Sequence, residues 1–275
     1  MSSFQMCNQS KIYGRSISHL YRMIYKLNPT LEKYEKLILK GHILRPHYAY
    51  ALITAAKEAC SLGYKKISVI EFGCAGGSGL VDLEYISNEV SKILDIQFEI
   101  YGFDTGEGMP ASTDYRDVLY QWSKGEYKMD LIKLQKMLHN TQLVIGDVKE
   151  TVPKFFDEFN PAPIGVVLID VDYYSAAKMC LQIFNHYSSL YIPRVFVYLD
   201  DTLGTSEFTG ELLAVNDYNH NNEKRKISIQ SLVAESMSLS WMKWIYLGKK
   251  FYHWHCFDHE KYSTSLDSRI SQLPL

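Results

Sequence analysis

Cysteine motifs, charge imbalance and long apolar runs are all missing from this 275-residue sequence. Its five cysteines are dispersed and form no C-x-x-C pair, which argues against a disulfide framework and a zinc knuckle. The 29 basic residues nearly balance the 31 acidic ones, so no whole-molecule field favours a nucleic-acid partner. No apolar run approaches the roughly 18 residues that span a bilayer. Because residues 1–10 also lack a signal-peptide pattern, we expect a cytoplasmic protein without a membrane partner.

The sequence does contain a hydrophobic fraction of 47%, arranged in short apolar runs that alternate with helical segments. The runs are rich in β-branched residues, which predicts strands at 66–72, 97–103, 142–145, 164–169 and 194–199. Apolar residues at helical spacing predict helices at 47–62, 78–94, 149–159, 174–188 and 210–221. This alternation indicates an α/β fold with a mostly parallel sheet that helices cover on both faces.

The two ends of the chain depart from this alternation. Segments 226–233 and 244–257 read as strands without a long helix between them, which predicts an antiparallel edge and seven strands in all. Residues 1–45 carry apolar side chains at helical spacing and are expected to form a helical N-terminal cap on a main domain at 46–275. Two alternative roles for this cap are a lid and a homodimer surface, and plain packing against the main domain is the favoured interpretation.

A glycine-rich turn follows the first strand, in the sequence EFGCAGGSG at 71–79. Glycines there let the backbone approach a ligand closely and present its amides. A dinucleotide fingerprint, G-x-G-x-x-G, would need glycines where Ala75 and Ser78 stand. The pattern E-x-G-x-x-G-G instead favours S-adenosylmethionine, with an ordinary tight turn as the alternative. The expected cofactor contacts in the turn are Glu71, Gly73, Gly76, Gly77 and Ser78.

Acidic residues also end the next two strands. Asp104 ends the second strand, where a carboxylate can accept both ribose hydroxyls of a nucleoside, and Thr105 follows it. Asp147 ends the third strand, where adenine would lie. Viewed singly, each acid is better explained as a helix N-cap or a solvated loop residue. Three successive acidic strand ends, Glu71 included, favour a ligand crevice and predict Asp104, Thr105 and Asp147 as cofactor contacts.

A further group of aspartates follows the fourth and fifth strands. Asp170 ends the run IGVVLID, and Asp200 and Asp201 end RVFVYLDD. Because neighbouring parallel strands end at one edge of a sheet, we expect these three residues to converge as metal ligands near the cofactor. Clustered carboxylates repel one another unless a cation offsets their charge, and their oxygens suit Mg²⁺. The alternative is that Asp172 and Asp201 cap helices while Asp170 and Asp200 contact the cofactor or water.

These segments together resemble the macrocin O-methyltransferase family, the metal-dependent sugar O-methyltransferases of macrolide biosynthesis. The resemblance is carried by EFGCAGGSG, GFDTGEGMP, GDVKETVP, DVDYYSAAK and LDDT, in the family's order. It implies a Rossmann-like class I methyltransferase fold that binds S-adenosylmethionine and a divalent metal. The implied cofactor contacts are Glu71, Gly73, Asp104 and Asp147, and the implied metal ligands are Asp170, Asp200 and Asp201. The family's D-S-F is replaced here by Asp104-Thr105-Gly106, and residues 120–140 and the tail do not clearly match.

The tail contains an unusual run of histidines and aromatic residues, FYHWHCFDH at 251–259. In a strand, His253 and His255 share one face. His255 is the candidate general base for the acceptor hydroxyl, with Asp170 as the other candidate catalytic residue. An edge strand whose histidines are hydrogen-bonded or exposed is the favoured alternative, and a zinc site lacks further ligands at suitable spacing.

The sequence thus predicts an enzyme that transfers a methyl group from S-adenosylmethionine to an oxygen of a small acceptor, assisted by Mg²⁺. A sugar or a glycosylated natural product is the expected acceptor. The alternatives are an NAD-dependent oxidoreductase, an enzyme resembling the cephalosporin hydroxylases, and a non-catalytic cofactor-binding protein on the same fold. The missing glycines argue against the first, and the retained aspartates argue against the last.

Overall fold

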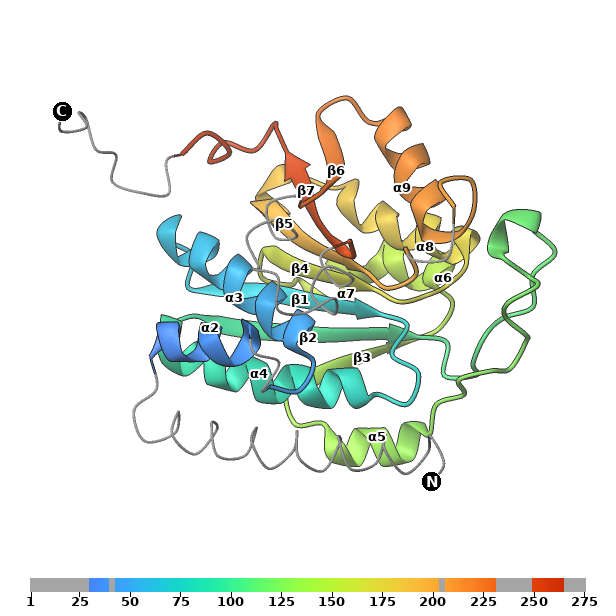
Figure 1. Ribbon diagram of the computed structural model, residues 1–275, viewed down its shortest axis with the longest axis horizontal. Helices are drawn as coiled ribbons and strands as arrows, with labels where there is room; N and C mark the ends of the chain where they lie inside the picture. Colours follow the sequence, from blue (N-terminus) through green and yellow to red (C-terminus); the bar gives the residue numbers. More distant parts are fainter. Residues whose placement is uncertain (1–29, 40–42, 203–205, 231–248, 265–275) are drawn as a thin grey trace, which may run out of the picture.

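Seven strands form one sheet in the computed structural model, which describes residues 30–39, 43–202, 206–230 and 249–264. The strand order is β3-β2-β1-β4-β5-β7-β6 (Figure 1). The first five strands in this order are parallel, and β7 runs antiparallel to both of its neighbours, as predicted. The strands are β1 (Lys66–Phe72), β2 (Gln97–Asp104), β3 (Thr141–Ile145), β4 (Ile164–Ile169), β5 (Tyr191–Leu199), β6 (Arg225–Ile229) and β7 (Phe251–Cys256).

Helices cover both faces of the sheet. The connection from β1 through α4 (Ser78–Leu94) to β2 and the connection from β4 through α8 (Tyr174–Cys180) to β5 step across the sheet in opposite directions. Right-handed crossovers therefore place α4 and α8 on opposite faces. The helix α3 (Pro46–Ser61) packs against α4, β1, β4 and β5, while α9 (Gly210–Asn221) packs beside α8 (Figure 1). The shorter helices are α2 (Leu31–Leu39), α5 (Leu131–Met137), α6 (Val148–Thr151) and α7 (Phe155–Phe159).

The strands in the middle of the sheet are buried because both of their faces are covered. Every residue of β4 is buried, and so is every residue of β1 after Lys66. Continuous apolar sequence is typical of such strands. Two polar side chains nevertheless lie inside β1. Ser68 donates a hydrogen bond to the Ala162 carbonyl, and Glu71 lies near the carboxyl end of the strand.

Several predicted elements are shorter in the structure than in the sequence analysis. The expected helix at 149–159 is divided into α6 and α7 by a 3-10 turn that contains Pro153, since proline supplies no N–H to the helical ladder. The helix predicted at 174–188 ends at Cys180 and continues as a 3-10 turn to Phe184. The strand predicted at 244–257 is described only from residue 249 and begins at Phe251.

The predicted N-terminal cap is described only in part. Residues 1–29 lie outside the described part of the chain, and so do residues 40–42. The helix α2 packs against α3, and its side chains Tyr34, Leu37 and Ile38 are buried in the same core as the sheet. The helix thus packs as an ordinary part of the domain, and the boundary at residue 45 stays a prediction.

The strand order reverses direction between β1 and β4. In open α/β sheets the crevice outside the carboxyl ends of strands at such a reversal is where ligands bind. Glu71, Asp104, Asp170 and Asp200 all lie at or next to the carboxyl ends of the parallel strands. In the part of the chain that the structure describes, no helix combines the length and apolarity that a membrane crossing requires.

Candidate active site

The glycine turn after β1 brings two strand ends into contact. Gly73 has a φ of +82°, a conformation that residues with a Cβ rarely adopt. A Cβ placed on Gly73 would lie 1.8 Å from the Asp170 carbonyl oxygen at the end of β4. The turn is therefore held directly against the strand end that carries Asp170, and glycine is the residue that permits this approach.

The rest of the turn leads into α4. Gly77, with a φ of +76°, is the N-cap, and a Cβ there would overlap the Leu134 side chain. Gly76 is exposed, and an added Cβ would meet nothing within 4 Å, so space for a ligand remains on this side. The Ser78 hydroxyl accepts a hydrogen bond from the Arg45 guanidinium at 2.8 Å. Cofactor contact by these three residues stays a prediction.

Asp104 connects the glycine turn to the loop after β2. Its carboxylate accepts one hydrogen bond from the Ala75 backbone N–H at 2.8 Å and another from the Gly106 N–H at 2.7 Å. These two bonds orient the carboxylate within the crevice, and its remaining lone pairs suit ribose hydroxyls. The Thr105 hydroxyl instead serves its own loop, because it donates to the Gly108 carbonyl at 3.0 Å.

Asp147 is a helix N-cap, which was the alternative role that its sequence position allowed. Its carboxylate accepts a hydrogen bond from the Lys149 N–H at 2.9 Å and caps α6. This is the ordinary function of an aspartate just before a helix. An adenine contact by Asp147 stays a prediction beside this capping role.

Glu71 is a buried carboxylate, and only one of its two oxygens accepts a hydrogen bond. It is 3% exposed, and Oε1 accepts a hydrogen bond from the Tyr48 hydroxyl at 2.6 Å. Its other oxygen, Oε2, is buried without a hydrogen-bond partner. Burial raises the pKa of Glu71 to about 7. A buried carboxylate oxygen without a donor is costly, and a ligand that carries a cationic N–H group would satisfy it.

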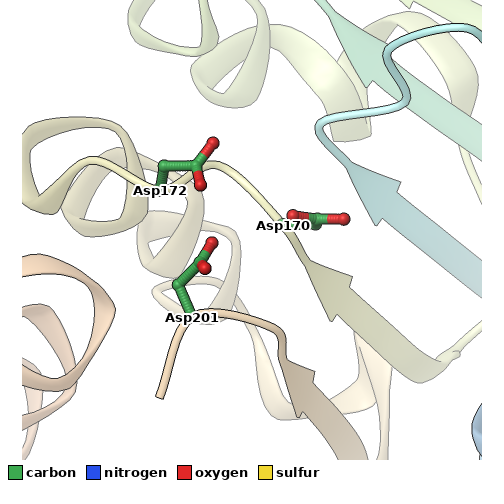
Figure 2. A group of neighbouring side chains, drawn as sticks. All are labelled: Asp170, Asp172 and Asp201. Carbon is green, nitrogen blue, oxygen red and sulfur yellow. The ribbon is translucent and has the colours of Figure 1, made fainter. Parts of the chain in front are cut away.

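Three aspartates form an acidic group at the ends of β4 and β5, as Figure 2 shows. Asp170, Asp172 and Asp201 each place one carboxylate oxygen within 4.8 Å of the others. Burial, and then the charges of Asp200 and Asp201, raise the pKa of Asp170 to about 8. Burial and the hydrogen-bonded neighbour Asp201 likewise raise the pKa of Asp172. Oxygen ligands at this spacing can hold Mg²⁺, whose charge would offset the repulsion between them.

Asp172 lies in a strained turn. Its φ is +58°, and the N–H of Tyr173 bonds to the carbonyl of Val171 across it. Such a three-residue turn with a positive φ is rare, and strain of this kind concentrates at functional sites. A helix cap was the alternative role for Asp172, but the N-cap of α8 is Tyr173, whose side chain makes no capping hydrogen bond.

Asp200 lies outside the acidic group, and its role as a metal ligand stays a prediction. The ammonium group of Lys250 donates to its Oδ1 at 3.0 Å, and the Tyr198 hydroxyl donates to the same oxygen. Lys250 is buried, whereas the Asp200 side chain is 35% exposed. Of the two aspartates, only Asp201 has a carboxylate oxygen in the group within 4.8 Å, although the charge of Asp200 also acts on Asp170. The group is therefore Asp170, Asp172 and Asp201, instead of Asp170, Asp200 and Asp201.

Glu211 connects the loops that carry these aspartates. This residue of α9 is fully buried, and its carboxylate accepts the backbone N–H groups of Asp201 and Val171. Burial raises its pKa well above the ordinary value for glutamate. In the sequence Glu211 looks like an acidic residue in a first helical turn, so only the tertiary contacts reveal this role.

His255 does not lie at the site, so its prediction as the general base is wrong. Because β7 is antiparallel, Phe251 pairs with Tyr198 near the site, and His255 pairs with Arg194 further along. Four residues of strand separate those two positions by about 13 Å. The imidazole bonds to the Ser228 hydroxyl at 3.0 Å and to the Tyr262 hydroxyl at 2.9 Å. Its ring is hydrogen-bonded, as the alternative interpretation describes, but β7 lies between β5 and β6 and is not the edge strand that this interpretation expected.

The N-terminal end of α3 contributes aromatic residues that the sequence analysis missed. The His47 ring stacks on the Tyr198 ring, with centroids 5.0 Å apart and planes at 28°. Tyr198 donates to Asp200, and Tyr48, next to His47, donates to Glu71. Pro46 marks the start of this helix in the sequence. That the first residues of α3 lie at the carboxyl ends of β1 and β5 depends on tertiary packing, which local sequence does not show.

Comparison with known proteins supports the fold. No protein-family model and no curated protein sequence matches the chain. Among solved structures, the O-methyltransferase NovP matches with a TM-score of 0.52 and 12% identity, over 90% of this chain and 98% of that one. The calicheamicin methyltransferase CalS11 gives a TM-score of 0.49 and 19% identity, over 74% of this chain and 82% of that one. The chain has the class I methyltransferase fold.

Proposed function

We propose that this protein is an S-adenosylmethionine-dependent O-methyltransferase of the kind that the macrocin family represents. The proposed acceptor is a small hydroxylated molecule, a sugar or a glycosylated natural product, and the proposed metal is Mg²⁺. The observation that carries the proposal is the contact between Gly73 and Asp170. It places the turn that would hold the methyl donor against the acidic group that would hold the acceptor.

The residues of the turn fit the cofactor. The buried, unpartnered Oε2 of Glu71 suits the ammonium group of the methionine moiety, and the oriented carboxylate of Asp104 suits the ribose diol. Tyr48 holds Glu71 in place through its hydroxyl. Exposed Gly76 leaves the approach to the α4 N-terminus open.

The acidic group fits a divalent metal. Three carboxylates of like charge within 4.8 Å, with raised pKa values, are more stable with a bound cation. When bound, S-adenosylmethionine would supply the methyl group and Mg²⁺ would lower the pKa of an acceptor hydroxyl. Glu211 holds the backbone of the two aspartate loops in register. Asp170, the member of the group next to the glycine turn, is the proposed acceptor of the hydroxyl proton.

Calorimetric titration with S-adenosylhomocysteine tests the cofactor assignment, with NADH as the control ligand. We expect heat of binding for the first ligand and none for the second, and the reverse result would contradict the proposal. Glu71→Gln should weaken the binding, since it removes the charge that faces the ammonium group. Transfer of a labelled methyl group to glycoside acceptors should then depend on Mg²⁺, and equal turnover in excess chelator would contradict the metal assignment.

A further inference from the structure

The loop between β2 and α5, residues 105–130, forms an arm that is closed upon itself. The N–H of Met109 donates to the Glu126 carbonyl at 2.8 Å, and the N–H of Gly125 donates to the Met109 carbonyl at 2.9 Å. A Lys128–Glu107 ion pair at 2.8 Å adds a further crosslink at the surface. Figure 1 shows the arm, in green, projecting from the side to which β1 and β2 point. It therefore borders the crevice at the strand ends.

The arm is attached to the segment that carries Asp172. Asp117 is fully buried, and its carboxylate accepts the N–H and the hydroxyl of Ser175, both at 2.7 Å. The guanidinium of Arg116 lies over the Tyr174 ring, 4.3 Å from its centroid. Ser175 and Tyr174 follow Asp172 by only three and two positions. These bonds fix the arm relative to the acidic group.

An aromatic pair stands on the fixed arm. The rings of Trp122 and Tyr127 meet edge to face, with centroids 6.0 Å apart and planes at 63°. Trp122 is half-buried, whereas Tyr127 is 55% exposed and has a φ of +60°. Burial, and then the charges of Asp172 and Glu126, raise the pKa of Tyr127. Because Asp117 ties the arm to Ser175, three residues after Asp172, the exposed ring stands on a segment that is fixed to the acidic group.

We propose that Trp122 and Tyr127 form the wall that binds a sugar ring of the acceptor. The inference rests on the proposed function, which it deepens by assigning residues that select the substrate. Aromatic faces carry negative potential and attract the polarised C–H groups of a sugar, while the hydroxyls on its rim reach the carboxylates. Trp122 holds the orientation of Tyr127, and Tyr127 provides the exposed contact. The arm thus favours a hydroxylated ring over an open-chain alcohol.

Saturation-transfer difference NMR on the full-length protein tests this wall, with a panel of methyl hexopyranosides as probes. The spectra are recorded with and without S-adenosylhomocysteine, so that a failure of cofactor binding does not hide the ring contact. We expect transfer to the ring C–H protons of at least one glycoside. Tyr127→Ala and Trp122→Ala should each weaken that binding by about three- to tenfold. Tyr127→Phe, which keeps the ring, should retain it.

The matched control is Tyr120→Ala, which removes an 83% exposed tyrosine from the same arm and should leave glycoside binding unchanged. Circular dichroism melts of all variants establish that the fold is retained. The assignment is overturned if no glycoside receives saturation, if both alanine variants bind like the unsubstituted protein, or if 3,4-dihydroxybenzoate binds in place of the glycosides. A failure of the proposed function has a different signature, because S-adenosylhomocysteine then gives no heat while the glycoside contacts persist.

Discussion

Asp172→Asn is expected to stabilise the metal-free protein and to remove most of the stabilisation that Mg²⁺ gives. Asp172 belongs to the group whose carboxylate oxygens lie within 4.8 Å of one another. Asparagine keeps the shape of the side chain and tolerates the φ of +58°. It cannot ionise, so the free-energy cost of keeping Asp172 protonated beside Asp170 and Asp201 is removed, and it is a weaker ligand for Mg²⁺.

The magnitude follows from the spacing of the charges. At an effective dielectric constant of about 20, two unit charges 4.8 Å apart repel each other by about 3.5 kcal/mol. Proton linkage sets a similar upper limit for the change in the free energy of unfolding. A carboxyl whose folded-state pKa lies above 7 lowers the free energy of unfolding at pH 7 by about 4 kcal/mol, relative to an unperturbed aspartate. We therefore expect Asp172→Asn to raise the free energy of unfolding by about 3 kcal/mol without metal.

The pH dependence has a definite sign. Because the pKa of Asp172 is raised on folding, its contribution to stability is complete below the unfolded-state pKa and is lost as pH rises through the folded-state pKa. The advantage of asparagine should thus vanish near pH 4 and grow by about 1.4 kcal/mol per pH unit up to neutrality. The pKa of Asp170 is also raised, to about 8, so the free energy of unfolding falls with rising pH for this group as well, both in the unsubstituted protein and in Asp172→Asn.

Urea denaturation followed by circular dichroism, in chelator and in Mg²⁺, measures both effects. Asp200→Asn is the matched control, because it leaves the buried Lys250 ammonium without its anionic partner at 3.0 Å. That variant should lose about 2 kcal/mol of stability and keep its response to Mg²⁺. Loss of the Mg²⁺ response in Asp200→Asn, together with its retention in Asp172→Asn, would refute the grouping of the three acids.

Three other substitutions test the surrounding site. Gly73→Ala should destabilise the fold by about 3 kcal/mol or more and abolish cofactor binding, because of its positive φ and the overlap with the Asp170 carbonyl. Gly76→Ala, where an added Cβ meets no protein atom, is the control for stability in thermal melts. Tyr48→Phe should raise the pKa of Glu71 above its present value of about 7, since it removes a donor that lowers it, and should shift the pH profile of S-adenosylhomocysteine binding upward. His255→Ala should leave methyl transfer nearly unchanged, and a loss of turnover in a folded variant would restore the discarded base assignment.

Much of the fold was accessible from local sequence. The run KISVIEF and the run IGVVLI predicted β1 and β4 with their observed bounds, since strands covered on both faces are mostly apolar. The bounds of α4 and α9 were also predicted, because glycines stand at their first turns and apolar spacing marks their length. Where local rules competed, as at Pro153, the single helix predicted at 149–159 is two short helices joined by a 3-10 turn.

The crevice could be predicted from local sequence, because acids that end successive parallel strands must gather at one edge of the sheet. Which of these acids lie next to one another depends on long-range packing. Lys250 is fifty positions from Asp200 in the chain, and antiparallel β7 brings its ammonium to that carboxylate and leaves Asp172 beside Asp170 and Asp201. The same strand direction carries His255 away from the site. Strand order and direction arise from packing across the whole sheet, and no local spacing of residues contains them.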